Sequence, residues 1–323
     1  MERAAQNEPL VSIAIPTYNR AGTYLRSCLA GALGQTYANL EIIAADNGST
    51  DGTADLVASY NDPRIRYFRH PVNIVPNDNF NFCLRQARGA YFQLLLDDEQ
   101  IDADFVESCL RAAGFSTEFG LIRTGLRTVD ARGTVIDESP NLADAGDSLS
   151  DYFLAWMAGR TKLYLCNTLL NRAALIDSGG FQSRHNLFQD VIAQVNVAAR
   201  MPRVEVAPVK ATTRQHSGQN TYAVKVQGWC EDSLELLELM CRVAPDREEL
   251  VRERGTRFFA LIGYSRANAI RSPAERARAY AMVYRLFGRR YVPPLRMALS
   301  GTALYRSLRQ VKRRVLNRPA WVD

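Results

Sequence analysis

The segment LVSIAIPTYNR, residues 10–20, decides the fold class of this 323-residue chain. Its apolar run Leu10–Ile15 has the length and flanks of a buried strand, and Pro16 ends it. Three more strands are expected at Leu40–Ala45, Ile65–Phe68 and Tyr91–Leu96. Helices are expected between and after these strands, at Thr23–Leu33, Ala54–Tyr60, Asn79–Arg88 and Asp104–Ala113. Gly89 is the expected C-terminal cap of the third helix. Alternation of apolar strands with helices predicts an α/β fold whose parallel sheet is covered on both faces.

The pattern loosens beyond Phe115. Strands are expected at Leu163–Leu170 and Val204–Val209, a helix at Val191–Met201, and only helices from Lys225 onward. We therefore expect a catalytic domain over residues 1–224, with a donor half at about 10–110 and an acceptor half at about 111–224. Residues 225–323 are expected to form a basic helical C-terminal region.

Composition places the chain among ordinary soluble globular proteins, with 47% hydrophobic and 23% charged residues. Met1 to Pro9 is polar and acidic, unlike a secretory signal peptide. No apolar run reaches the roughly 18 residues of a membrane-spanning helix. The six cysteines form no C-x-x-C pair, and scattered free thiols favour a cytoplasmic location.

Positive charge is concentrated at the C-terminal end. Arg271 to Asp323 carries 13 Lys or Arg and two acids, and the rest of the chain is mildly acidic because the total is +6. Basic tails bind phosphate, nucleic acid or anionic lipid. The tail lacks the interleaved aromatics of a single-strand binder, so no nucleic-acid partner is expected. From Leu304, an apolar stripe beside arginines predicts contact with an anionic membrane at the inner face of the cell membrane, or packing on the catalytic body.

Polar residues follow the first two expected strands, where parallel sheets bind ligands. The first strand ends in Pro16-Thr17-Tyr18-Asn19-Arg20, which is neither a G-x-G-x-x-G nor a Walker loop. Main-chain groups and one aromatic can hold a nucleobase there. The second strand ends in Asp46-Asn47-Gly48, where an acid can accept from a base or ribose. Either loop taken alone could be a plain polar turn.

The fourth expected strand ends in Asp97-Asp98-Glu99. Three adjacent carboxylates repel each other unless a cation lies among them. Oxygen ligands suit Mg²⁺ or Mn²⁺, which would neutralise a diphosphate leaving group. The alternative is a solvated acidic turn that caps the next helix.

These blocks together, VSIAIPTYNR, EIIAADNGSTDGT and ARGAYFQLLLDDEQ, resemble the inverting family 2 glycosyltransferases of the GT-A fold. The resemblance implies a Rossmann-like, mostly parallel sheet flanked by helices. It also implies a nucleotide-diphosphate sugar donor (UDP favoured), a divalent metal, and transfer with inversion to a glycan or lipid-linked acceptor, as in cell-surface polysaccharide biosynthesis. A catalytically inactive binding or scaffold relative is the alternative, since Phe80, Glu99 and Gln189 depart from the family pattern. A nucleotidyltransferase is less favoured, because no Gly-rich basic loop follows the first strand.

The resemblance also assigns site residues. It implies a nucleotide-sugar site made of Pro16, Thr17, Tyr18, Asn19, Arg20, Asp46, Asn47, Asn81, Asp97 and Arg214. A naive overlay makes Asp97 and Glu99 the metal pair. Counting from Ala87–Gly89 instead puts Asp98 in the ligand place and Asp97 near the ribose, and we prefer this register. His216, in Arg214–Gly218, is a further expected ligand, so the expected metal set is Asp98, Glu99 and His216.

Asp190 is the expected general base. Gly179-Gly180-Phe181 precedes Phe188-Gln189-Asp190, and the family places an acid at the start of a helix after such a segment. This base would take the proton from the acceptor hydroxyl. The compatible alternative is that Asp190 is the N-cap of Val191–Met201.

Overall fold

The computed structural model describes residues 8–144, 146–215 and 225–293. Its first half alternates strands and helices as the sequence predicts, and the four strands are parallel. The elements are β1 (Val11–Thr17), α1 (Leu25–Leu33), β2 (Leu40–Asp46), α2 (Thr53–Ala58), β3 (Ile65–Arg69), α3 (Pro76–Gln86), β4 (Tyr91–Leu94), β5 (Gln100–Ile101) and α4 (Phe105–Ala112).

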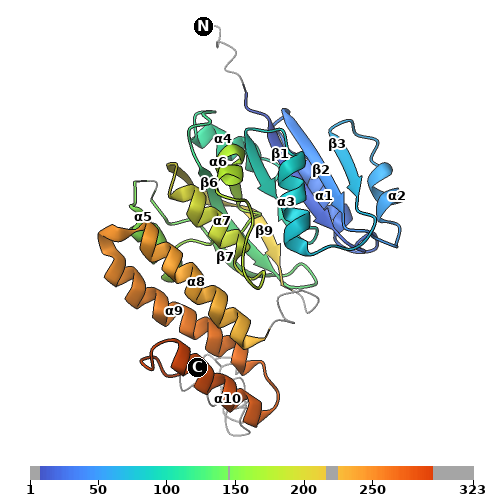
Figure 1. Cartoon of the computed structure of the whole chain (residues 1–323). Helices are drawn as coiled ribbons and strands as arrows, with labels where there is room; N and C mark the ends of the chain where they lie inside the picture. The colour runs from blue at the N-terminus through green and yellow to red at the C-terminus, as the bar shows by residue number, and fades with distance from the viewer. Residues whose placement is uncertain (1–7, 145, 216–224, 294–323) are drawn as a thin grey trace, which may run out of the picture. The chain divides into compact units, whose positions relative to one another are not determined.

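All described strands belong to one mixed nine-stranded sheet (Figure 1). Its order is β3-β2-β1-β4-β8-β6-β9-β5, and β7 pairs with β6. The later elements are β6 (Leu121–Val129), β7 (Val135–Ser139), α5 (Leu149–Met157), β8 (Thr168–Asn171), α6 (Arg172–Asp177), α7 (Gln189–Ala198) and β9 (Arg203–Arg214). The parallel prediction holds for β1 to β4 and for β6 with β9, whereas β8 is antiparallel to both of its neighbours. The expected α/β class, with a mixed sheet flanked by helices, is confirmed.

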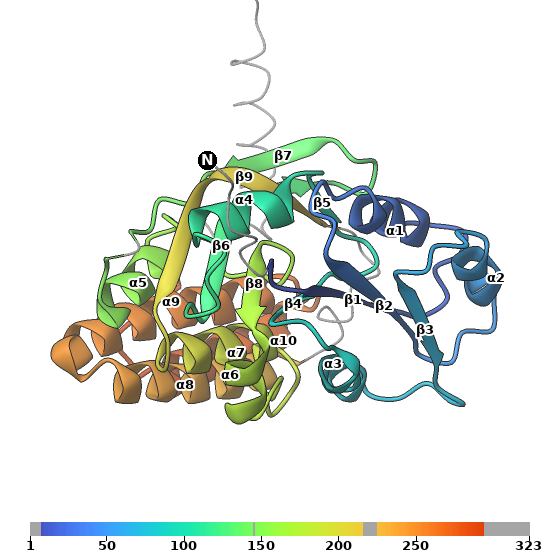
Figure 2. The same ribbon diagram turned by 90° about the horizontal axis from the view of Figure 1, so that it is seen from above.

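Helices cover both faces of this sheet, with α1 and α4 on one face and α3, α6 and α7 on the other (Figure 2). Alternate β1 residues Val11, Ile13 and Ile15 join the core under α1 and α4 and are fully buried. The other face buries Phe92 and Phe181 near α3. Burial on both faces explains why the strands have no polar alternation.

Three local expectations are wrong. The strand expected at Leu163–Leu170 begins only at Thr168, because the chain turns there and the Thr168 N–H donates to the Leu165 carbonyl. The helix expected at Asn79–Arg88 starts at Pro76, a residue suited to the first helical turn. Gly89 does not cap it, because Ala87 is the C-cap residue. A Cβ at Gly89 would lie 2.7 Å from the Leu10 carbonyl oxygen, so this glycine permits close approach to β1.

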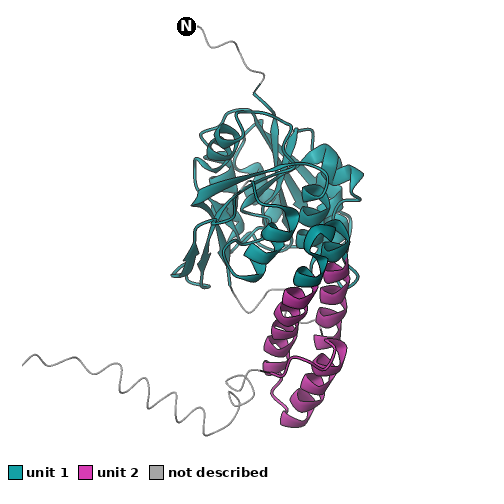
Figure 3. Cartoon of the chain, turned by 90° about the vertical axis from the view of Figure 1, so that its left-hand side faces the viewer, with its two compact units in different colours: residues 1–222, 239–251 teal, residues 223–238, 252–323 magenta. Residues whose placement is uncertain are grey.

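The chain divides into two compact units, shown in Figure 3. One comprises residues 1–222 and 239–251, and the other residues 223–238 and 252–323. The described residues from 225 onward form α8 (Val226–Val243), a 3-10 turn at Pro245–Arg247, α9 (Glu248–Asn268) and α10 (Pro273–Leu286), as predicted. The domain boundary at residue 224 stays a prediction, since compactness does not establish independent folding. Among the described residues, no helix is both long and apolar enough to cross a membrane.

Candidate active site

The loops that follow β1 and β2 are joined at the carboxyl edge of the sheet. The strands run in register so that Thr17 lies beside Asp46. Beyond them, the Asn19 N–H donates to Ser49 Oγ at 2.9 Å, and the Thr50 N–H donates to Asn19 Oδ1 at 2.8 Å. Asn19 has a positive φ of 54°, which asparagine tolerates better than most residues. The two predicted nucleotide loops therefore form one hydrogen-bonded unit.

Asp46 is completely buried within this unit. Its Oδ1 accepts the Ser49 N–H at 2.7 Å, and its Oδ2 accepts the Tyr67 hydroxyl at 2.6 Å. Arg69 Nε lies 3.9 Å from the same Oδ2. Both carboxylate oxygens are thus occupied by the protein, which stabilises the loop.

Asn47 is likewise engaged with the protein. Its side-chain amide donates to the Ile74 carbonyl and accepts the Ile74 N–H, both at 2.9 Å. Gly48 has a φ of +77°, and a Cβ there would lie 2.8 Å from the Val72 carbonyl carbon. Tyr18, in contrast, is 42% exposed at the same edge. Of these predicted contacts, the Tyr18 ring is the group left open to a ligand.

The acidic turn after β4 lies beside the β1 loop, because Arg20 Nε is 3.6 Å from Asp97 Oδ1. Glu99 closes the turn from within. Its carboxylate accepts the Leu96 N–H at 3.0 Å, and its own N–H donates to the Leu96 carbonyl at 2.9 Å. Glu99 is 4% exposed, whereas Asp97 and Asp98 are only partly buried.

Burial also dominates the acid–base properties of this turn. It raises the pKa of Asp97 to about 6, although Thr17 and the Arg20 charge act in the opposite direction. Burial, with a smaller contribution from the neighbouring Asp98 charge, raises the pKa of Glu99 to about 8. The fold therefore holds Glu99 as an internal, weakly acidic group. Asp98, the ligand in the preferred register, is less buried than Glu99.

Arg214, at the end of β9, reaches the acidic turn from more than a hundred residues away. Its Nε donates to the Asp98 carbonyl at 3.4 Å, and its Nη1 donates to the Asp130 carbonyl at 3.1 Å. Its guanidinium lies 4.5 Å from the Tyr24 ring centroid. Three of the predicted residues, Asp97, Asp98 and Arg214, are thus brought together.

Asp190 lies in the first turn of α7, on the other side of the sheet from α1. Phe188 is the N-cap residue of α7 and makes no side-chain cap bond, so Asp190 is not the N-cap residue itself. Its Oδ1 nevertheless accepts the first-turn Val191 N–H at 2.9 Å. Burial raises the pKa of Asp190 to about 6. A carboxyl group with this pKa is still mostly ionised at neutral pH and is a stronger base than an exposed Asp.

A short segment between α7 and the acidic turn connects the two regions. The Thr168 hydroxyl lies 3.4 Å from Gln194 Oε1 in α7. Two residues earlier, burial and then the nearby Glu99 charge raise the pKa of the Cys166 thiol well above its usual value. Residues 166–168 therefore link the helix that carries Asp190 to the base of the acidic turn.

Asn81 is placed differently from the expectation of a nucleotide contact. Its Nδ2 donates to the Phe181 carbonyl and its Oδ1 accepts the Phe181 N–H, both at 2.9 Å. The neighbouring Phe80, which stands where relatives carry arginine, is 8% exposed and packs edge-on against the Phe181 ring at 6.0 Å. Both side chains are directed at the Gly179–Phe181 turn.

The donor set is compatible with a hard divalent cation supplied with its substrate. Within the described ranges, no group of three or more His, Cys, Asp or Glu side chains is arranged to hold a metal. Mg²⁺ and similar ions commonly use one or two carboxylates and complete their coordination with substrate phosphates and water. Partly exposed Asp98 fits that pattern, whereas the Glu99 carboxylate faces the Leu96 main chain. His216 lies outside the described residues.

Two residues at this edge were missed by the sequence reasoning. Arg69 pairs in register with Asp46 and donates to the Ser49 carbonyl at 2.6 Å. Its position at the carboxyl end of a third parallel strand was a usable signal. Tyr24 donates to the Ala131 carbonyl at 3.4 Å and lies under Arg214, a contact that no local pattern indicates.

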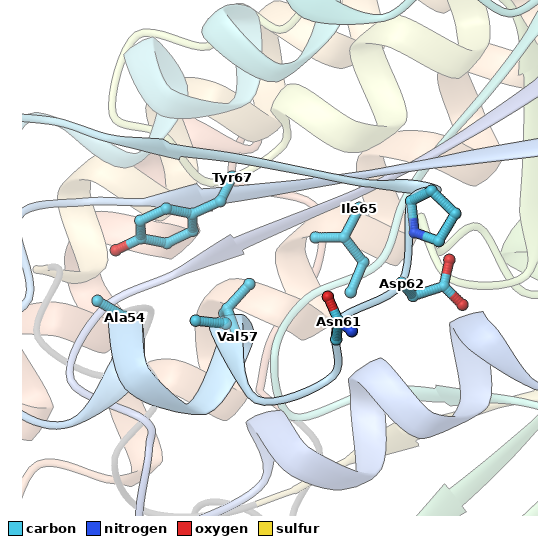
Figure 4. Close-up of a pocket in the computed structure, with 8 residues that line it drawn as sticks. Ala54, Val57, Asn61, Asp62, Ile65 and Tyr67 are labelled. Atoms are coloured by element: carbon cyan, nitrogen blue, oxygen red, sulfur yellow. The ribbon is translucent and has the colours of Figure 1, made fainter.

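Two surface pockets lie away from the predicted residues. One of about 300 Å³ lies between α2 and β3, where Val57 and Ala54 face Ile65 and Tyr67 (Figure 4). The other, of about 580 Å³, is lined by residues 8–10, Ala90 and residues 115–118. Neither is lined by any predicted site residue, so the candidate site is an open edge rather than either of these pockets.

Comparison with known proteins finds a family match over part of the chain. Residues 12–119 match the family described as Glycosyl transferase family 2. The chondroitin synthase of Escherichia coli is 33% identical over 135 residues, which is 41% of this chain and 19% of the synthase. The putative glycosyltransferase EpsH of Bacillus subtilis is 28% identical over 169 residues, 52% of this chain and 48% of EpsH. The chain thus matches less than a fifth of the chondroitin synthase and about half of EpsH.

Solved structures share the fold over nearly the whole chain. S. aureus TarS 1-349 in complex with UDP-GlcNAc has a TM-score of 0.63 at 16% identity, covering 95% of this chain and 92% of that structure. The mannosyltransferase PcManGT from Pyrobaculum calidifontis, in complex with GDP-Man and Mn²⁺, has a TM-score of 0.56 at 16% identity, with coverage of 96% and 86%. At this identity the likeness establishes the fold.

Proposed function

We propose that the chain is a metal-dependent, inverting glycosyltransferase that moves a sugar from a nucleotide-diphosphate sugar to an acceptor hydroxyl. The observation that carries the proposal is the convergence of Arg20, Asp97, Asp98 and Arg214 at the carboxyl edge of the sheet. The match of residues 12–119 to family 2 supports it. An inactive scaffold would have no need of two partly exposed carboxylates at an edge that also carries two arginines.

The donor nucleotide is proposed to lie across the β1 and β2 loops. Pro16, Thr17 and the exposed Tyr18 ring would contact the base, and Asp97 would accept from the ribose. Asp46, Asn47 and Asn19 would serve by holding these loops, given their bonds within the protein. UDP is favoured because the TarS neighbours bind UDP and UDP-GlcNAc, although PcManGT binds GDP-Man.

The proposed cofactor is Mn²⁺ or Mg²⁺, held chiefly by Asp98. Such an ion, when bound with the donor, offsets the negative charge of the departing diphosphate. Arg20 and Arg214 would add positive charge at the same edge without entering the metal's coordination. His216 and Glu99 remain proposed as further ligands, with Glu99 the weaker candidate because its carboxylate is turned inward.

Asp190 is proposed as the general base. Its carboxylate would take the proton from the acceptor hydroxyl as that oxygen forms a bond to the anomeric carbon. The bond from that carbon to the diphosphate oxygen breaks with its electron pair, and the diphosphate leaves. Attack opposite to the leaving group inverts the anomeric configuration.

The acceptor is proposed to be a glycan or lipid-linked saccharide in polysaccharide synthesis, in line with the chondroitin synthase relatives. The basic C-terminal region would keep a cytoplasmic enzyme at an anionic membrane, where each basic residue contributes about 1 kcal/mol. The apolar stripe starting at Leu304 lies entirely outside the described residues. Flotation with phosphatidylglycerol vesicles, with and without residues 304–323, tests this part: salt-sensitive co-flotation that is lost on truncation supports it.

A donor screen tests the proposed activity. UDP-, GDP-, TDP- and CDP-sugars are incubated with the protein and Mn²⁺, and nucleotide release is measured with and without EDTA. We expect release from one nucleotide class that stops in EDTA, and NMR of a transfer product to show the opposite anomer. Donor binding with no release from any sugar, across acceptor mixtures, would favour the inactive scaffold.

A further inference from the structure

Asn81 connects helix α3 to a turn that is distant in sequence. It lies in α3, one hundred residues before the turn that it contacts, and both polar atoms of its amide are bonded to Phe181. We propose that Asn81, with Phe80, is a positioning residue that holds the Gly179–Phe181 turn and thereby places Asp190 for acceptor deprotonation. The inference rests on the proposed role of Asp190.

The turn depends on conformations that only glycine adopts readily. Gly179 has a φ of +94° and Gly180 a φ of +72°. A Cβ at Gly180 would fall on the Oδ1 atom of Asn81. The Asn81 amide can therefore approach the turn this closely only because residue 180 has no side chain.

Aromatic packing fixes the same turn from a second side. The Phe181 ring is 1% exposed and packs edge-on against Phe80 at 6.0 Å, and it lies 6.2 Å from Phe92 of β4. Phe80 stands at the place where a phosphate-binding arginine is expected from the resemblance. In this chain the position contributes to the core beside the turn, and a buried phenylalanine offers no contact to phosphate.

The chain between Phe181 and Asp190 is short and internally braced. Ser183 Oγ accepts the Leu187 N–H at 3.2 Å and the Phe188 N–H at 3.3 Å. Leu187 and Phe188 are buried, and α7 begins at the next residue. Because this connection has little freedom, a displacement of Phe181 is passed to the first turn of α7, which carries Asp190.

The geometry separates this role from nucleotide binding. A residue that contacts the donor raises the Kd or KM of the donor when it is removed. A residue that only orients the base lowers kcat in transfer and leaves donor binding unchanged. Loss of the base itself costs about 10² to 10⁴ in rate, so misplacing it is expected to cost about 10- to 100-fold.

The experiment is a double-mutant cycle in the full-length protein with Mn²⁺ and its cognate donor. Asn81→Leu removes both amide bonds at similar volume, and Asn81→Asp keeps an acceptor for the Phe181 N–H as a milder second variant. Each is made in wild type and in Asp190→Asn. We expect Asn81→Leu to lower kcat about 10- to 100-fold in wild type and less than about threefold in Asp190→Asn, with UDP affinity unchanged.

Gln35→Met is the matched control. Gln35 is also a buried amide bonded to the main chain of another segment, donating to the Asp102 carbonyl at 2.9 Å and accepting the Val106 N–H at 3.0 Å. Gln35 lies away from α7. Gln35→Met should therefore change kcat by the same factor in wild type and in Asp190→Asn. Equal losses from Asn81→Leu in both backgrounds, or a raised Kd for UDP, would overturn the positioning role.

The outcomes distinguish this inference from the function it rests on. If Asp190→Asn alone leaves kcat intact, the proposed base is wrong. If Asp190→Asn is damaging but the cycle shows no coupling, only the positioning role of Asn81 fails. Should Asn81→Leu not fold, Asn81→Asp supplies the same comparison, with a smaller loss expected in wild type and none in Asp190→Asn.

Discussion

The loop after β2 and the turn after β4 both carry acids at the carboxyl end of a buried parallel strand, yet their carboxylates are in different environments. Asp46 is fully buried, and its oxygens accept from Ser49 and Tyr67. After β4, Asp97 and Asp98 keep partial exposure, and only Glu99 is turned into the protein. An acid at a strand end can thus either stabilise the loop that follows the strand or contact a bound ligand.

This difference shows that the position of an acid in the fold is not enough to assign its role. Burial and the hydrogen bonds of Asp46 and Glu99 show that these two carboxylates stabilise their loops. On this view Asp98 and Asp190 act on substrates, whereas Asp46 and Glu99 maintain the geometry. Substitutions at these four positions should therefore fall into two groups.

The largest effect is expected at Asp98. Asp98→Ala removes the proposed metal-binding carboxylate of the turn, and transfer should fall by at least about 10³-fold, the upper range for losing a group that stabilises transition-state charge. Binding of UDP in Mn²⁺, measured by calorimetry, should weaken as well. Normal turnover by this variant would place the metal elsewhere.

Asp190→Asn should give the next largest loss, about 10² to 10⁴ in kcat. Burial raises the pKa of Asp190 to about 6, and only the ionised form can accept a proton. Wild-type kcat should therefore fall as the pH drops through about 6 and reach a plateau above it. A pH–rate profile from pH 5 to 8 checks this. The acid limb should become shallower in Asp190→Asn, and any limb that persists there reports Asp97, whose pKa is also raised to about 6.

Glu99→Gln should have a smaller effect, below about tenfold in kcat, because the amide oxygen can still accept the Leu96 N–H. Asp98→Asn, its matched neighbour, should be far more damaging. If the order is reversed in parallel kinetic assays, Asp97 and Glu99 form the working metal pair.

Asp46→Asn should have the smallest effect on catalysis, within about threefold in kcat. Asp46→Ala, which leaves the buried Ser49 N–H and Tyr67 hydroxyl without this partner, should lower the free energy of unfolding by about 1–3 kcal/mol. Urea denaturation compares the three proteins. A stable Asp46→Asn variant that no longer binds UDP would show that Asp46 contacts the base directly.

The sequence predicts the first half of this fold well because its signals are local. Apolar strands end in loops at Thr17, Asp46 and the acidic turn, and parallel pairing brings those ends together. The second half depends on long-range pairing. Nothing near Thr168 in sequence indicates that β8 lies between β4 and β6 and runs antiparallel to both.

The candidate site shows the same limit. The family resemblance proposes Asp98, Asp190 and Arg214 as site residues. It could not show that both polar atoms of the Asn81 amide bond to Phe181, or that the Glu99 carboxylate accepts the Leu96 N–H. Such assignments depend on side-chain direction, and a one-residue shift in the turn after β4 exchanges an inward for an outward carboxylate.

The most direct test of the account is nucleotide release from the cognate sugar donor by wild type, Asp98→Ala and Asp46→Asn, each in Mn²⁺ and in EDTA. We predict release by wild type and Asp46→Asn in Mn²⁺ and none in EDTA, with Asp98→Ala inactive in both. Full release by Asp98→Ala, or by wild type in EDTA, would contradict metal-dependent sugar transfer at this edge.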